Sequence, residues 1–86
     1  MVYHYKTQGT CSKEMIIELE QNVIKSIEIV GGCNGNLKGI CALVTGMDAD
    51  GVIKRCKGIK CGLRQTSCPD QLAIALIQAK AQQSQQ

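Results

Sequence analysis

The stretch TSCPDQLA, residues 66–73, places a cysteine at the predicted start of the last helix of this 86-residue chain. Proline fixes φ near the helical value and has no N–H, so Pro69 suits the first helical position and Cys68 the N-cap or its neighbour. The unpaired N–H groups and the dipole of a helix N-terminus favour the thiolate form of a cysteine. We therefore expect Cys68 to act as a metal ligand or a reactive thiol.

Length and composition predict one small domain with an aliphatic core. The 86 residues include no Phe or Trp, two Tyr and six Cys. A domain of this size buries about 60% of the surface of its unfolded chain, so its stability is marginal and additional stabilisation by disulfides or a bound metal is expected. The six cysteines are the candidates for either.

The N-terminal segment MVYHYK, residues 1–6, contains no apolar signal sequence, so we expect a cytoplasmic protein. In the reducing cytosol, cysteine clusters are metal sites or redox groups more often than structural disulfides. No apolar run approaches the roughly 20 residues of a membrane helix, which argues against a membrane partner.

The net charge of +3 is modest, and a loose basic cluster surrounds Cys61. We interpret this cluster as a solvated face rather than a nucleic-acid site, because no stacking aromatic residues are interleaved. Its members are Lys54, Arg55, Lys57, Lys60 and Arg64.

Hydrophobic periodicity predicts three strands followed by three helices. Strands are expected at residues 2–7, 14–20 and 23–30, with a polar turn at 8–12 and a tight turn at Gln21-Asn22. The first helix should end at Gly46, the second should run from an Asp48 cap to Gly58, and the third should start at Pro69. This order indicates an α+β fold, in which a three-stranded antiparallel meander carries three helices on one face. The domain is assigned to residues 1–81, with a flexible glutamine-rich tail at 82–86.

The direction of the chain predicts that four cysteines converge at one edge of the sheet. Cys11 lies in the first turn, Cys33 after the third strand, Cys61 before the last helix and Cys68 at its start. These positions share an edge if the helices pack antiparallel through their short loops.

Four converging thiolates suit Zn²⁺ or an iron–sulfur cluster, with Cys11, Cys33, Cys61 and Cys68 as the ligands. The alternative is a thiol–disulfide or electron-relay protein, in which Cys68 is the attacking thiolate and Cys61 or Cys33 resolves the mixed disulfide. The spacing contains no CxxC pair, so both hypotheses depend on convergence rather than on a motif, and four reduced thiols without a function are the third interpretation.

Other features receive structural interpretations. Cys41 and Cys56 fall within helices and are expected to be buried as small hydrophobic side chains. His4 is expected to be a surface histidine rather than a ligand. The run GGCNGN, residues 31–36, could form a phosphate-binding nest, but it lacks the GxGxxG pattern and a βαβ unit, so we favour a left-handed turn.

Six short motifs together resemble the TSCPD-domain proteins, a family of small stand-alone bacterial proteins. The motifs are YKT (5–7), GTC (9–11), GGCNGNL (31–37), GM (46–47), GIKCG (58–62) and TSCPDQLA (66–73). The resemblance covers nearly the whole chain. It implies that the family pattern falls on the same four cysteines that the chain direction brings together, and that Cys41 and Cys56 are additions in this chain.

A related domain is appended to cobalamin-dependent ribonucleotide reductases. The resemblance thus implies an accessory role in ribonucleotide reduction and DNA synthesis, a link to nucleotide binding, and a reductase or an iron–sulfur or redox protein as partner. Reduction catalysed by this chain alone is disfavoured, because 86 residues are too few to enclose a nucleotide, a radical generator and a thiol pair. The order of elements is also similar to NifU-like iron–sulfur scaffold proteins. The oligomeric state stays open, a homodimer included.

Overall fold

The computed structural model describes residues 1–9, 12–32, 34–60, 62–63 and 65–84. Strands β1 (Val2–Lys6), β2 (Ser12–Glu20) and β3 (Val23–Gly31) are followed by helices α1 (Asn34–Val44), α2 (Ala49–Cys56) and α3 (Cys68–Ser84). The strands form one antiparallel sheet in the order β1-β2-β3. The predicted α+β fold, a three-stranded meander followed by three helices, is confirmed.

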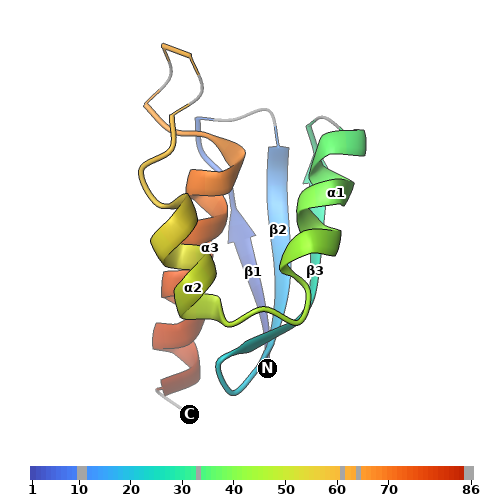
Figure 1. Cartoon of the computed structure of the whole chain (residues 1–86), viewed down its shortest axis with the longest axis vertical. Helices are drawn as coiled ribbons and strands as arrows, with labels where there is room; N and C mark the ends of the chain where they lie inside the picture. The colour runs from blue at the N-terminus through green and yellow to red at the C-terminus, as the bar shows by residue number, and fades with distance from the viewer. Residues whose placement is uncertain (10–11, 33, 61, 64, 85–86) are drawn as a thin grey trace.

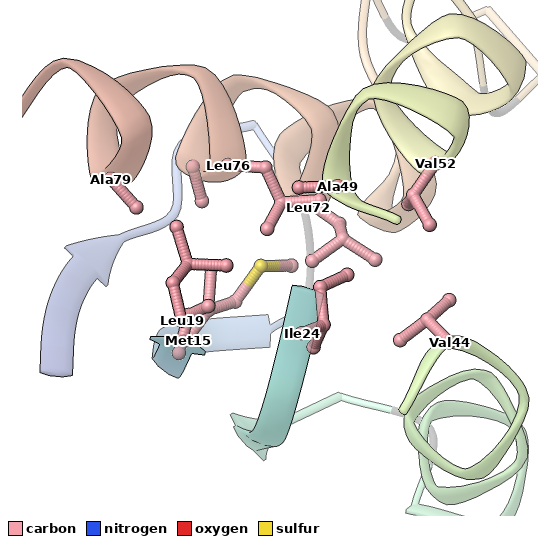
Figure 2. Packing of buried hydrophobic residues seen from close by; sticks show 11 residues of the cluster. Met15, Leu19, Ile24, Val44, Ala49, Val52, Leu72, Leu76 and Ala79 are labelled. Atoms are coloured by element: carbon pink, nitrogen blue, oxygen red, sulfur yellow. The ribbon is translucent and has the colours of Figure 1, made fainter. Parts of the chain in front are cut away.

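One face of the sheet carries the core, because the side chains of β2 alternate between buried and half-buried. Met15, Ile17 and Leu19 are at most 1% exposed, while Ile16 and Glu18, which alternate with them on the opposite face, are half-buried. The helices cover this apolar face (Figures 1 and 2). The buried cluster consists of Met15, Ile17, Leu19, Ile24, Val44, Ala49, Val52, Leu72, Ala75, Leu76 and Ala79.

Helix α3 contributes a face of Leu and Ala, and its alanines let the helix approach the sheet closely. Leu72, Ala75, Leu76 and Ala79 are fully buried at helical spacing. Ile77 lies off this face and is 38% exposed, because it follows Leu76 around the helix and away from the sheet.

The direction of the chain is as predicted from the element order. The ends of β1, β3 and α2 and the starts of β2, α1 and α3 lie at the same end of the molecule, at the top of Figure 1. We call this the loop end. The two chain termini lie at the opposite end (Figure 1).

Several element boundaries differ from the prediction. Strand β2 begins at Ser12 rather than at residue 14, because Ser12 pairs with Gly31 across a register shift. Helix α3 ends at Ser84, within the glutamine-rich segment that begins at residue 82.

The tight turn predicted at Gln21-Asn22 joins β2 to β3. Gln21 takes the positive φ in this turn, at 56°. The Asn22 side chain instead donates hydrogen bonds to Asp48 and, at 3.0 Å, to Asp50, and so fixes the turn to the start of α2. Asp48 caps α2 as predicted, and its carboxylate accepts the Gly51 N–H at 3.1 Å.

Among the residues described, no helix combines the length and apolar character needed to cross a membrane.

Replacing Leu76 with alanine should lower the free energy of unfolding by about 2–5 kcal/mol, because it leaves a cavity in the core. Leu43→Ala is the matched control, since Leu43 is a helical leucine that is 77% exposed, and it should change stability by only about 0.5 kcal/mol. Urea unfolding measures both. Equal losses would contradict the assignment of the core.

Candidate functional site

Cys68 is the first residue of α3, and Ser67 is the N-cap. The Ser67 hydroxyl oxygen accepts the Asp70 N–H at 3.1 Å, and the Ser67 carbonyl accepts the Gln71 N–H at 2.8 Å. The prediction that Pro69 takes the first helical position is therefore wrong by one residue; Pro69 is second, where its missing N–H also costs no helical hydrogen bond. A serine three residues before an acidic residue is a capping signal that was present in the sequence.

The thiol of Cys68 is reduced and half-buried, and it faces the start of β2. Its Sγ lies 3.5 Å from the Oγ of Ser12, at hydrogen-bonding distance for sulfur. Ser12 follows Cys11 directly in the sequence and is paired with Gly31 on β3. Cys68 therefore contacts Ser12, the residue next to the predicted ligand Cys11.

Asp70, on the first turn of α3, ties this turn to the end of α2. Asp70 is 8% exposed, and its carboxylate accepts the Gly58 N–H at 2.7 Å and the hydroxyl of Thr66. The hydrogen bonds from Thr66 and then Gly58 hold the pKa of Asp70 below its ordinary value, with a smaller contribution from the charge of Lys57. A second tie is the Ser67 hydroxyl, which donates to the Ile59 carbonyl at 2.6 Å.

Gln71 makes the corresponding contacts to β1 and the loop that follows it. Its Oε1 accepts the Tyr5 hydroxyl at 2.8 Å and the Gln8 N–H at 2.9 Å, and its Nε2 donates to Thr66 Oγ1 at 3.0 Å. Burial is the main cause that raises the pKa of Tyr5, so its hydroxyl keeps the proton that it donates. Sequence reasoning gave Gln71 no role, because its partners are distant in the chain.

Gly9 permits the loop after β1 to pack directly on Thr66. Its φ is +73°, and a Cβ added there would lie 2.8 Å from the Thr66 Cγ2. A side chain at this position would therefore be strained by the backbone and would also clash. The loop that leads to Cys11 and the segment that leads to Cys68 are in close contact.

Three of the four predicted ligands, Cys11, Cys33 and Cys61, lie outside the described residues. Within the described part of the chain, no three His, Cys, Asp or Glu side chains are grouped to hold a metal ion. Cys68 itself fits a thiolate site, since its sulfur is reduced, half-buried and beside a hydroxyl group. The all-sulfur donor set of the prediction suits Zn²⁺ and iron–sulfur clusters, not Mg²⁺ or Ca²⁺.

The remaining cysteines have different surroundings. Cys56 is half-buried and packs against the core, and Cys41 lines a hollow of about 280 Å³ between β3 and α1. Both were expected to be buried, and both are half-buried. Burial still raises the pKa of each thiol, and the charge of Glu28 adds to this for Cys41. Both thiols are thus neutral near neutral pH.

His4 lies on the uncovered face of the sheet, as expected of a surface histidine. Its side chain is 60% exposed and its Nδ1 lies 2.8 Å from Glu14 Oε2. Four of the five basic residues around Cys61 are exposed near the loop end, namely Lys54, Arg55, Lys57 and Lys60, and Arg64 lies outside the described residues.

The family model of the TSCPD domain matches residues 2–80. The chain belongs to the TSCPD domain family. The matched range contains all six cysteines and every strand and helix except the last residues of α3. No curated protein and no solved structure gives a significant match. In the motif itself, Ser67 and Asp70 hydrogen-bond to Ile59 and Gly58 in the loop after α2, and Thr66 donates to Asp70. The thiol of Cys68 lies beside the hydroxyl of Ser12.

Asp70 should make the stability of the metal-free TSCPD domain depend on pH. Its pKa is lowered on folding, so its ionised form stabilises the protein above the unfolded pKa of about 4, and this stabilisation is lost as the pH falls through the folded pKa. Urea unfolding across this range should show that wild type exceeds Asp70→Asn in stability near neutral pH. The difference should shrink on acidification. A difference that does not change with pH would contradict an ionised Asp70.

Proposed function

We propose that this TSCPD domain is a non-enzymatic protein that binds Zn²⁺ or an iron–sulfur cluster through the thiolates of Cys11, Cys33, Cys61 and Cys68. The observation that carries the proposal is the 3.5 Å contact between Cys68 Sγ and Ser12 Oγ. It joins the first turn of α3 to the residue that follows Cys11, although the two residues are 56 positions apart.

The segments that lead to the other two cysteines support the same grouping. Gly31, two residues before Cys33, is paired with Ser12 in the sheet. Ile59, two residues before Cys61, accepts the hydroxyl of Ser67 at 2.6 Å. In the sequence, Cys11, Cys33 and Cys61 therefore each lie within two residues of a described residue whose contacts are at the loop end.

A structural metal would suit a domain with so small a core. Bound zinc contributes on the order of 10 kcal/mol of apparent binding free energy, which becomes folding free energy when the unfolded chain has no preformed site. Four thiolates leave a zinc site with net negative charge, and the exposed Lys57 and Lys60 nearby would partly offset it.

The biological setting that we propose is accessory to ribonucleotide reduction in the cytoplasm. The support is the family membership, together with the resemblance to the domain appended to cobalamin-dependent reductases. The partner would be a ribonucleotide reductase or an iron–sulfur or redox protein that supports it.

Metal analysis of protein purified without oxygen tests the proposal. Stoichiometric zinc, or iron with inorganic sulfide and the visible absorption of a cluster, supports it and identifies the metal. Metal-free protein that forms a reversible disulfide at Cys68 would favour the thiol–disulfide alternative. Metal-free protein without such a disulfide would contradict both.

Replacing Cys68 with serine should lower the affinity for metal by more than about 10-fold, because even changes beyond the ligands cost 10- to 100-fold in many metal sites. The melting temperature of the loaded protein should fall with it. Cys56→Ser is the matched control, since Cys56 is half-buried in α2 and packs against the core. Competition with a chromophoric chelator measures both variants. Equal affinities would contradict the role of Cys68 as a ligand.

A further inference from the structure

We infer that Gln71 is a positioning residue, which fixes the loop bearing Cys11 and the loop bearing Cys61 relative to Cys68. This inference rests on the proposed metal site and adds a residue that coordinates no metal itself. It starts from a buried amide: Gln71 is 4% exposed, and both ends of its side chain are hydrogen-bonded.

Gln71 connects three segments that the sequence separates. Its Oε1 holds the Tyr5 hydroxyl of β1 at 2.8 Å and the Gln8 backbone N–H at 2.9 Å, and Gln8 is three residues before Cys11. Its Nε2 donates to Thr66 at 3.0 Å, two residues before Cys68. Gln71 is also one helical turn after Cys68, so both side chains lie on the same side of α3.

The hydrogen bonds continue beyond Thr66 into the second loop. The Thr66 hydroxyl donates to Asp70, and Asp70 accepts the Gly58 N–H at 2.7 Å. An unbroken series of hydrogen bonds therefore runs from Gln8 through Gln71, Thr66 and Asp70 to Gly58. It links the loop after β1 to the loop after α2 across the first turn of α3.

Such a series matters for ligand geometry because a metal holds its ligands within narrow limits of distance and angle. Groups that do not bind the metal can still orient its ligands, as a carboxylate or backbone carbonyl does when it hydrogen-bonds to a ligating histidine. Mutation of such a group typically lowers metal affinity 10- to 100-fold. Gln71 acts in this sense on the backbone N–H of Gln8 in one loop and on the hydroxyl of Thr66 in the other. A methionine in its place would have similar length and no hydrogen bonds to either loop.

The chain offers a matched control on the same helix. Gln78 accepts the hydroxyl of Tyr3 at 2.8 Å, so it repeats the tyrosine–glutamine contact between β1 and α3, but it is exposed and far from the loop end. Leu76→Ala is a second control, which destabilises the core without touching either loop. A purely structural role for Gln71 predicts that loss of affinity follows loss of stability in all three variants.

The experiment compares wild type, Gln71→Met, Gln78→Met and Leu76→Ala for binding of Zn²⁺ by chelator competition, with the absorption spectrum of bound Co²⁺ as a report on thiolate geometry. We expect Gln71→Met to bind Zn²⁺ about 10- to 100-fold more weakly, with an altered Co²⁺ spectrum. Gln78→Met and Leu76→Ala should retain wild-type affinity and spectrum while folded. In metal-free Gln71→Met, the amide of Gln8 should exchange with solvent faster.

The outcomes separate this inference from the proposed function. If wild type binds Zn²⁺ and Gln71→Met binds it equally well, or if the affinity of Leu76→Ala falls as much, Gln71 has no positioning role and the metal site stands. Unchanged exchange at the Gln8 amide would also overturn the inference. If wild type binds neither metal and carries no cluster, the proposed function fails and this inference fails with it.

Discussion

A buried carboxylate sets the geometry of the loop end. A carboxylate removed from water must receive hydrogen bonds, or the folded state bears the cost of its desolvation. Asp70, at 8% exposure, obtains them from the Gly58 N–H and the Thr66 hydroxyl. Helix α3 can therefore begin where it does only when the chain leaving α2 has folded back against it. The position of Cys68 follows from that requirement, because Cys68 lies in the same helical turn.

In the TSCPD motif, some residues hold the structure together, and Cys68 supplies a thiol. Thr66, Ser67 and Asp70 join α3 to the segments around it, and Pro69 suits the first turn of a helix because it lacks an N–H. The thiol of Cys68 is left facing the start of β2. The apolar cluster in the middle of the molecule holds the sheet to the helices, whereas the loop end is held by hydrogen bonds. A ligand bound at the loop end would stabilise the part of the domain that the core does not reach.

Local patterns in the sequence were sufficient to predict the sheet, the order of elements and the chain direction, because alternation in β2 and caps such as Asp48 act over a few residues. The hydrogen bonds of the site were beyond such reasoning. Gln71 and Tyr5 are 66 residues apart and meet only after the sheet and α3 have packed. The cap at Ser67 was missed for another reason. Proline favours the first position of a helix, so Pro69 predicted a helix start one residue later than the observed start at Cys68. The grouping of Cys11, Cys33 and Cys61 with Cys68 stays a prediction, since only Cys68 is described.

The placement of the termini bears on how such a domain can be combined with others. Met1 exchanges hydrogen bonds with Leu19 at the far end of β2, and Lys80 near the end of α3 pairs with Asp50 at the start of α2. Both termini thus leave the molecule at the pole remote from Cys68 (Figure 1). A polypeptide fused to either terminus would leave the domain at the end opposite the loop end. The loop end, with the thiol of Cys68, would therefore stay accessible in a fusion at either terminus.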